Sequence, residues 1–170
     1  MFRIKNLTTS ALCAALIALL AQIILPLPGG VPLTMQTLGI AFCGFYLGYG
    51  KGCAVVAVYL LLGATGLPVF SGFSGGFSAL IGPAGGYLWG FLPMVFLCGI
   101  KGNAPYRLTL GALGLLLCHG SGLLWYSFST HAGIGAALLT ISLPTLWKDA
   151  LCLPLALWIS TRLAKILAKK

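Results

Sequence analysis

Apolar segments follow one another along almost the whole chain, and this succession limits what the chain can fold into. Of its 170 residues, 59% are hydrophobic and 6% are charged. A soluble domain carries roughly 25% charged residues, because its surface faces water. The chain has too few charges to cover such a surface, which excludes a soluble globular enzyme, a nucleic-acid-binding domain and a disordered protein. The pattern indicates an integral membrane protein.

The length of the chain limits the number of membrane spans. A membrane helix needs about 20 apolar residues, so the chain has room for about six spans with short loops and no soluble domain. Helices are expected because an open sheet edge cannot sit in lipid, and Pro144 and Pro154 are expected to bend the last one. We predict one all-α membrane domain over residues 1–170, with spans at residues 8–25, 31–47, 53–67, 87–100, 108–126 and 138–163.

The basic residues are segregated, and their distribution predicts a topology. The chain has ten Lys and Arg residues and one acidic residue. If the N-terminus is cytoplasmic, nine of the ten basic residues fall on the cytoplasmic side and the opposite loops carry no charge, as the positive-inside rule expects. Both termini are therefore predicted to be cytoplasmic, in a multi-pass protein of the cytoplasmic (inner) membrane. The nine residues are Arg3, Lys5, Lys51, Lys101, Arg107, Arg162, Lys165, Lys169 and Lys170.

One charged pair does not fit this pattern. Lys148, the tenth cation, directly precedes Asp149, the single acidic residue, and both fall in the outer half of the last span. A charge inside the bilayer is costly unless it faces a partner or a polar cavity. Adjacent helix residues lie about 100° apart, so the two side chains are not expected to face each other squarely. One interpretation is a structural pair that neutralises itself or reaches the outer interface.

The other interpretation of this pair is a ligand pocket near the outer surface. Lys148 would bind an anionic group, and Asp149 would accept hydrogen bonds from N–H donors. Together they suit a small molecule with a carboxylate at one end and paired N–H groups at the other.

A segment rich in Gly, Ser and Phe, residues 69–87, lies between the third and fourth spans. It is either a flexible outer loop or a wall of the same pocket, because irregular backbone at membrane depth needs protein or a cavity beside it. In a pocket, its glycines permit close approach of the backbone, its aromatic rings form apolar walls and its serines offer hydroxyls. The residues assigned to this wall are Phe70, Phe73, Ser74, Gly75, Gly76 and Tyr87.

Two further patterns leave ligand binding and helix packing equally open. Gln36 and Thr34 are polar residues at the outer start of the second span, where they would contact a ligand or a neighbouring helix. In the first span, small residues four apart allow close helix approach in lipid, either within the chain or to another membrane subunit. These small residues are Ala11, Ala14, Ala15 and Ala18.

Neither a catalytic set nor a cofactor site is expected. The six cysteines form no CxxC pair and are scattered in apolar stretches, which is typical of small core residues. His119 and His131 are 12 residues apart, and no second carboxylate or cysteine cluster joins them to complete a metal site. The phosphate-binding patterns GxxxxGK[ST] and GxGxxG are both absent. We therefore predict that the chain is not an enzyme.

Four stretches carry a more specific pattern: residues 31–38 (VPLTMQTL), 63–70 (GATGLPVF), 75–76 (GG) and 80–91 (LIGPAGGYLWGF). With the six apolar segments and the Lys148–Asp149 pair, they resemble the BioY family. This family comprises the biotin-specific substrate-binding (S) components of energy-coupling factor (ECF) transporters. One position departs from the family pattern, because Ala84 stands where a threonine usually follows the proline.

The resemblance implies an S-component-like helical bundle that binds biotin for uptake, with no cofactor. It implies partners as well: a T-type transmembrane coupling subunit and two cytoplasmic ATPases. Biotin has a carboxylate, a ureido ring with two N–H groups and an apolar bicyclic body. Lys148 would bind the carboxylate and Asp149 the ureido N–H groups, while residues 70–87 and Trp147 would enclose the rings. The alanines of the first span would dock the coupling subunit.

Two alternatives remain open. The chain could be a stand-alone carrier or facilitator for biotin or another small carboxylated vitamin. It could also be a structural or assembly membrane protein in which Lys148 and Asp149 are merely paired.

Overall fold

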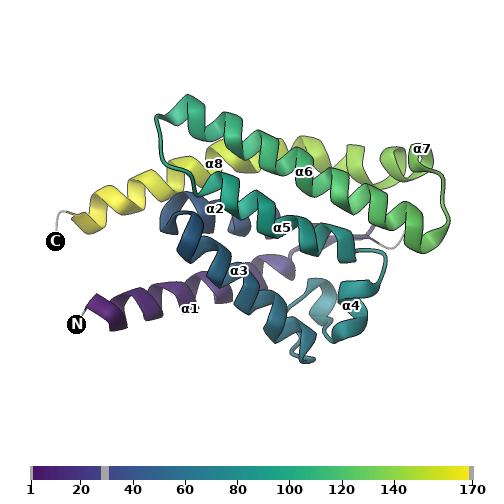
Figure 1. Cartoon of the computed structure of the whole chain (residues 1–170), viewed down its shortest axis with the longest axis horizontal. Coiled ribbons are helices and arrows are strands. Elements are labelled where there is room, and N and C mark those ends of the chain that lie inside the picture. Colours follow the sequence, from purple (N-terminus) through teal and green to yellow (C-terminus); the bar gives the residue numbers. More distant parts are fainter. Residues whose placement is uncertain (1, 28–30, 169–170) are drawn as a thin grey trace.

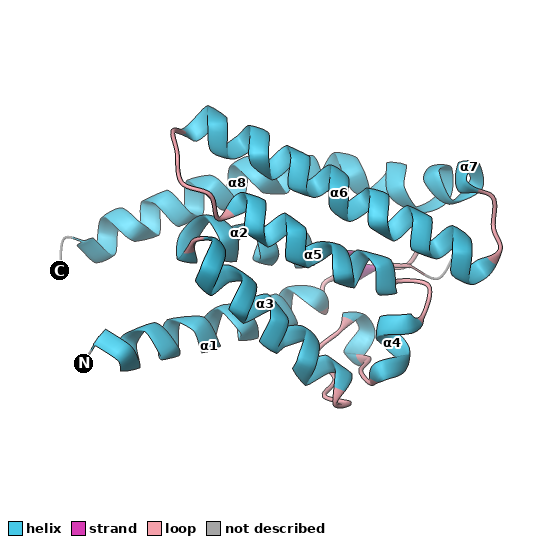
Figure 2. Cartoon of the chain, in the orientation of Figure 1, coloured by secondary structure: helices cyan, strands magenta, loops and turns pink. Residues whose placement is uncertain are grey.

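Long helices form almost the entire structure, a computed structural model that describes residues 2–27 and 31–168 (Figures 1 and 2). The helices are α1 (Phe2–Ala21), α2 (Gln36–Leu47), α3 (Tyr49–Ala64), α4 (Phe77–Ile81), α5 (Gly85–Cys98), α6 (Ala104–Thr130), α7 (Ile134–Ala137) and α8 (Leu143–Ala168). A 3₁₀ turn, η1 (Ser71–Phe73), and a π-helical turn, η2 (Leu138–Ser142), complete the helical elements. The strands β1 (Ile24–Leu25) and β2 (Leu33–Thr34) pair antiparallel.

Each predicted span contains one long helix, but the helix ends differ from the predicted bounds for local reasons. The α6 helix begins at Ala104 because Asn103 caps it, with Oδ1 accepting a hydrogen bond from the Tyr106 N–H at 3.1 Å. Between α1 and α2, residues at the ends of two predicted spans form the β1–β2 pair instead, with Ile24 opposite Thr34. Short apolar runs do not distinguish strand from helix. The predicted break after Leu25 continues into residues 28–30, which lie outside the described part of the chain.

Helix length separates two helices from the others. The 27-residue α6 and the 34-residue run Ile134–Leu167 are long and apolar enough to cross a membrane. By contrast, α2 has 12 residues, which is about 18 Å at the usual rise per residue and less than the hydrocarbon thickness of about 30 Å. Six complete crossings therefore stay a prediction, although the bundle is helical throughout its described core.

The beginning of α1 and the end of α8 lie at the same end of the bundle, together with the α2–α3 and α5–α6 connections (Figure 1). This end carries Lys51 in the first turn of α3 and Lys165 in the last turn of α8. Lys51 Nζ donates to Asn6 Oδ1 at 3.0 Å and so ties α3 to α1. Lys169 and Lys170, predicted for the same side, lie outside the described residues.

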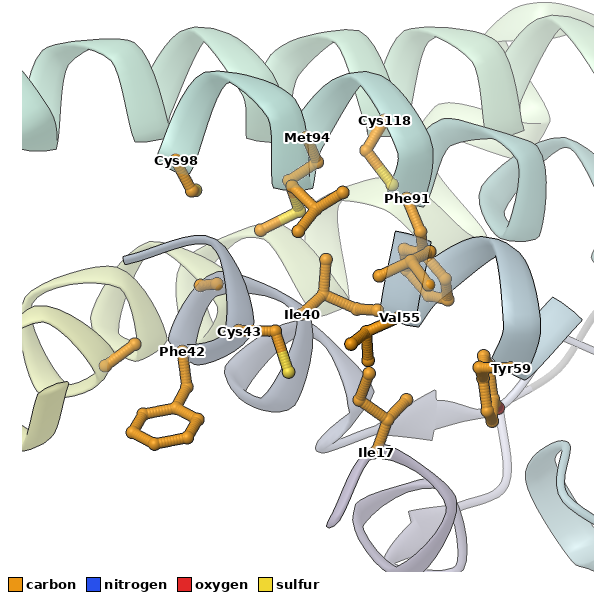
Figure 3. Packing of buried hydrophobic residues seen from close by; sticks show 14 of the residues in the cluster. Ile17, Ile40, Phe42, Cys43, Val55, Tyr59, Phe91, Met94, Cys98 and Cys118 are labelled. Atoms are coloured by element: carbon orange, nitrogen blue, oxygen red, sulfur yellow. The ribbon is translucent and has the colours of Figure 1, made fainter. Parts of the chain in front are cut away.

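The apolar core lies between the helices and is packed with aliphatic, aromatic and cysteine side chains. Figure 3 shows Ile17 of α1, Ile40 of α2 and Met94 of α5 within this core, and all three are fully buried. The six cysteines are free, and Cys43 and Cys98 are fully buried in the same cluster. They act as small core residues, which is the role that their scatter favoured.

Glycines bring α5 and α6 into close contact. A Cβ atom on Gly86 would lie 2.6 Å from Ser121 O, and one on Gly90 would lie 2.8 Å from Cys118 Cα. Only a hydrogen in place of a side chain allows the two backbones to approach this closely, as is common between helices in membranes. Both helices contribute residues to the cavity described below, Tyr87 from α5 and His119 from α6.

The irregular segment between α3 and α5 is anchored at several points. Trp89 Nε1 donates to Leu80 O at 3.1 Å, and Trp125 Nε1 donates to Gly82 O at 3.0 Å. Gly76 has φ +97°, a conformation that favours glycine, and its N–H donates to Gly63 O at 2.7 Å. Hydrogen bonds to α3, α5 and α6 therefore hold a segment whose composition alone suggested a flexible loop.

The π-helical turn η2 ends at Ser142, two residues before Pro144. Proline lacks an N–H and its ring collides with the carbonyl of the residue four positions earlier, and a wider turn relieves that collision. Ile141, within this turn, lines the cavity. The bends at Pro144 and Pro154 stay a prediction.

Candidate functional site: a cavity beside a buried ion pair

A cavity of about 480 Å³ lies at the end of the bundle away from the beginning of α1. Its wall is built from residues within four ranges of the sequence: 31–37, 70–91, 118–119 and 141–149. These ranges are the β2–α2 start, the irregular segment with the first half of α5, the middle of α6 and the η2–α8 region. Cavities of this size are typical of small-molecule sites.

Three charged or titratable side chains meet at one wall. Asp149 Oδ2 lies 3.1 Å from His119 Nε2, and Asp149 Oδ1 contacts Lys148 Nζ. The side chains of His119, Asp149 and Lys148 are 8%, 6% and 13% exposed. Charges this deeply buried need partners, and here each one has a partner of opposite charge or a hydrogen-bond donor.

Lys148 also ties α8 to the β2 strand, because Nζ donates to Thr34 O. Lys148 and Asp149 were not expected to face each other squarely, but their charged groups are in contact because the lysine side chain is long. Its long stem carries the ammonium back over the adjacent carboxylate, whatever the angle between the two Cβ atoms. The two groups therefore act together at one wall.

Tyr87 connects α5 to the turn before α8. Its hydroxyl lies 2.9 Å from Ser142 Oγ, and its ring meets the His119 ring edge to face at a centroid distance of 5.8 Å. A Cβ on Gly122 would fall 2.4 Å from the Tyr87 ring, so the glycine makes room for this side chain. The ring thus holds His119 in place from the side of α5.

Phe70 forms an apolar part of the cavity wall and is 2% exposed. Its ring packs edge to face against Tyr59 at 5.5 Å between centroids. The ring occupies the space left by Gly63, where a Cβ would lie 2.0 Å from it. The residues around Gly63 and Phe70, which looked distinctive in the sequence, are therefore a matched contact between α3 and the irregular segment.

Gln36 both lines the cavity and joins neighbouring elements. Its Nε2 donates to Tyr59 Oη at 2.7 Å, and its Oε1 accepts from Thr34 Oγ1 at 3.1 Å. Tyr59 Oη in turn donates to Val69 O at 3.0 Å. Gln36 and Thr34 thus contact neighbouring parts of the chain and also line the cavity, so helix packing and ligand contact are both open to the same residues.

The structure brings most of the predicted site residues to the cavity and leaves three away from it. The residues that line it are Gln36, Phe70, Ser74, Gly75, Tyr87, Lys148 and Asp149. Outside its wall lie Phe73, Gly76 and Trp147; Phe73 is 72% exposed and Trp147 is 64% exposed. Trp147 precedes Lys148 by one residue, so the helix turns its ring by about 100° away from the cavity.

His119 joins the site although the sequence did not assign it there. A polar residue within an apolar span was the available signal, since a carboxylate in lipid needs donors. Its partner lies 30 residues away on another helix, and only the packing of α6 against α8 brings the two together. Within the described ranges, no group of three or more His, Cys, Asp or Glu residues could hold a metal ion.

The four alanines of α1 divide into two pairs. Ala14 and Ala18 pack against the core of the chain itself, whereas Ala11 and Ala15 are exposed. Ala11 and Ala14 also border a mostly apolar groove of about 320 Å³ between α1 and α3. Internal packing and an open surface are therefore both present on this helix.

Comparison with known proteins places the chain in a family. The BioY family model matches residues 1–169. The Biotin transporter BioY of Thermotoga maritima is 37% identical over 166 residues, covering 95% of this chain and 97% of the relative. The Probable biotin transporter BioY of Pyrococcus horikoshii is 35% identical, covering 94% and 96%.

The fold agrees with these sequence matches. A crystal structure of the S-component for biotin from an ECF-type ABC transporter matches with a TM-score of 0.87 and 30% identity, over 96% of this chain and 92% of that one. The chain belongs to the BioY family.

Proposed function

We propose that the chain is the membrane-embedded biotin-binding subunit, the S component, of an ECF-type ABC transporter. Its relatives are named biotin transporters, and the similar crystal structure is that of an S-component for biotin. The observation that carries the proposal to this chain is the cavity of about 480 Å³ with a buried Asp149–Lys148–His119 group at one wall.

The chemistry of this cavity suits biotin. Its polar wall offers Asp149, whose carboxylate accepts hydrogen bonds from the ureido N–H groups. Phe70 and Tyr87 supply apolar surfaces for the bicyclic body, and Ser74 offers a hydroxyl. A carboxylate that is already buried among donors can exchange one donor for another without a new desolvation cost.

Lys148 would bind the biotin carboxylate, and this requires a movement of its side chain. Its ammonium contacts Asp149 Oδ1 and Thr34 O, whereas the carboxylate of biotin lies at the far end of a flexible chain from the ureido ring. The four-carbon stem of lysine allows Nζ to turn from the first position to the second. Binding would then separate the ion pair, with one charge serving each end of the ligand.

The same proposal assigns topology and partners. Six crossings with both termini in the cytoplasm would place the cavity near the outer surface. Exposed Ala11 and Ala15 would dock a T-type transmembrane coupling subunit, because small residues let helices approach closely in lipid. Two cytoplasmic ATPases would supply the energy, since the sequence carries neither GxxxxGK[ST] nor GxGxxG.

The test is a titration of the purified chain in detergent or nanodiscs with biotin. We expect saturable binding at micromolar or lower concentration. The variant Leu151→Ala should bind equally well, because Leu151 is 62% exposed on α8, the helix that carries Lys148 and Asp149. Uptake into vesicles that contain the chain with and without the energising subunits separates the S component from a stand-alone carrier. Absence of saturable binding by the wild-type chain would contradict the proposal.

A further inference from the structure

One nitrogen of His119 has no role in the contacts described so far. The Nδ1 atom is buried and has no hydrogen-bond partner among the described residues, and the residue is 6% exposed. Buried polar atoms without a partner are rare because each one costs the free energy of losing its water. His119 lines the cavity, so a ligand in the cavity is the available partner.

The other ring nitrogen determines which kind of partner fits. Asp149 Oδ2 is a carboxylate oxygen that only accepts, and it lies 3.1 Å from Nε2. Nε2 must therefore carry the proton in this contact. In the neutral ring, Nδ1 is then left with a lone pair and no hydrogen, so it is an acceptor. The partner that suits it is an N–H donor.

Asp149 can serve as a second acceptor in the same wall. Its Oδ1 contacts the Lys148 ammonium but makes no hydrogen bond of good geometry, and it is also buried. His119 Nδ1 on α6 and Asp149 Oδ1 on α8 are thus two buried acceptors without a hydrogen-bond partner among the described residues, and both residues line the cavity. A ligand ring with two N–H groups can supply one donor to each of these acceptors.

We infer that His119 contacts the ligand directly and accepts one ureido N–H at Nδ1, while Asp149 accepts the other. This inference rests on the proposed function, because the ureido ring belongs to biotin. His119 then forms two hydrogen bonds: Nε2 donates to Asp149, and Nδ1 accepts from the ligand. The Tyr87 ring beside it, at 5.8 Å between centroids, keeps the imidazole in the orientation that both contacts require.

Two substitutions separate these two hydrogen bonds. In His119→Asn, the amide lies where Nδ1 was but does not reach Asp149. In His119→Gln, the amide reaches Asp149 but leaves the Nδ1 position without an acceptor. If His119 contacts biotin, His119→Asn retains more affinity than His119→Gln, and His119→Gln weakens binding by about tenfold or more. If His119 only supports Asp149, the order of the two variants is reversed.

Biotin methylated on one or the other ureido nitrogen identifies the acceptor of each N–H. Wild type is expected to lose about tenfold or more in affinity for both analogues. His119→Gln should abolish the penalty at one nitrogen, and Asp149→Asn should abolish it at the other. If both substitutions act at the same nitrogen, or if neither changes a penalty, the inference is overturned.

The design keeps the inference separate from the proposed function. Failure of the wild-type chain to bind biotin contradicts the proposed function, whereas wild-type binding with unchanged affinity in His119→Gln contradicts only the role of His119. Thermal unfolding of each variant in the same detergent checks that it folds. Should a variant not fold, the wild-type measurement still decides, because full tolerance of a methyl group at either nitrogen also overturns the inference.

Discussion

Gln22, near the end of α1, holds Phe70 at the cavity wall. Its Nε2 donates to Phe70 O at 3.1 Å, and its Oε1 accepts from the Phe73 N–H at 2.8 Å. One amide thus fastens the 3₁₀ turn of the irregular segment to the helix that carries the exposed alanines. The contact joins a wall of the cavity to a surface proposed for docking.

Removal of this amide should loosen the wall. We expect Gln22→Leu to increase the rate of biotin dissociation by about tenfold, because two hydrogen bonds that position the Phe70 segment are lost. Gln22→Glu, which still accepts from Phe73 but cannot donate to Phe70, should have an intermediate effect. Stopped-flow or filter-binding dissociation measures the rate, and Thr65→Ala, whose hydroxyl donates to Leu62 O near the end of α3, is the control. Equal rates in wild type and Gln22→Leu would show that the tie does not govern ligand release.

Neutralising the carboxylate of Asp149 should affect stability and binding differently. Asp149→Asn leaves the Lys148 ammonium buried without its counter-charge, which costs about 3–5 kcal/mol for a buried pair, and biotin binding should fall by about 100-fold or more. The double variant Lys148→Met with Asp149→Asn should regain thermal stability without regaining affinity. A double variant that binds biotin as wild type does would remove both residues from the site.

Exchanging the two charges tests whether they are merely paired. In Lys148→Asp with Asp149→Lys, the ion pair can still form, but an ammonium faces His119 and a carboxylate faces Thr34 O. We expect biotin binding to be lost, because the donors and acceptors at the wall are reversed. Isothermal titration of the swapped chain gives the answer. Preserved activity would favour the structural alternative, in which only the pairing matters.

The close contact of α5 and α6 predicts an asymmetric effect of substitutions at glycine. Gly90→Ala should lower thermal stability by about 1–3 kcal/mol or prevent folding, since a Cβ would lie 2.5 Å from Ser121 Oγ. Gly120→Ala is the matched control in α6, because no atom lies within 4 Å of its Cβ position. Its effect should be neutral or slightly stabilising. Thermal unfolding in one detergent compares them, and equal loss in both variants would show that helix propensity and not packing is responsible.

Bulk on the exposed side of α1 should separate binding from transport. Ala15→Trp is expected to leave biotin affinity of the isolated chain unchanged, because Ala15 is exposed and is not one of the residues that line the cavity. It should abolish uptake in vesicles that contain the energising subunits, since a large ring prevents close helix docking. Leu116→Trp, at a position 59% exposed on α6, should leave uptake intact. Normal uptake with Ala15→Trp would exclude this side of α1 as the docking surface.

Much of the helical architecture followed from composition. Apolar runs and the scarcity of charge predicted one long helix in each of six segments, and the Lys148–Asp149 pair stood out because a charge in lipid requires a partner. The β1–β2 pair was missed, since apolar runs of a few residues fit a strand as well as a helix. Phe73, Gly76 and Trp147 were assigned to the pocket from residue type and position along the chain, and the structure places all three outside its wall.

The order of apolar and basic residues along the chain was sufficient to specify a helical membrane protein and to single out its one acidic residue, because the cost of placing charge in lipid acts on each residue wherever its neighbours lie. Which side chains contact that acidic residue was decided by the packing of the helices. His119 reaches Asp149 because α6 packs against α8, and no spacing in the sequence encodes a 3.1 Å contact between residues 30 positions apart. Side-chain contacts across helices depend on the sum of many small packing energies, and these exist only in the folded chain.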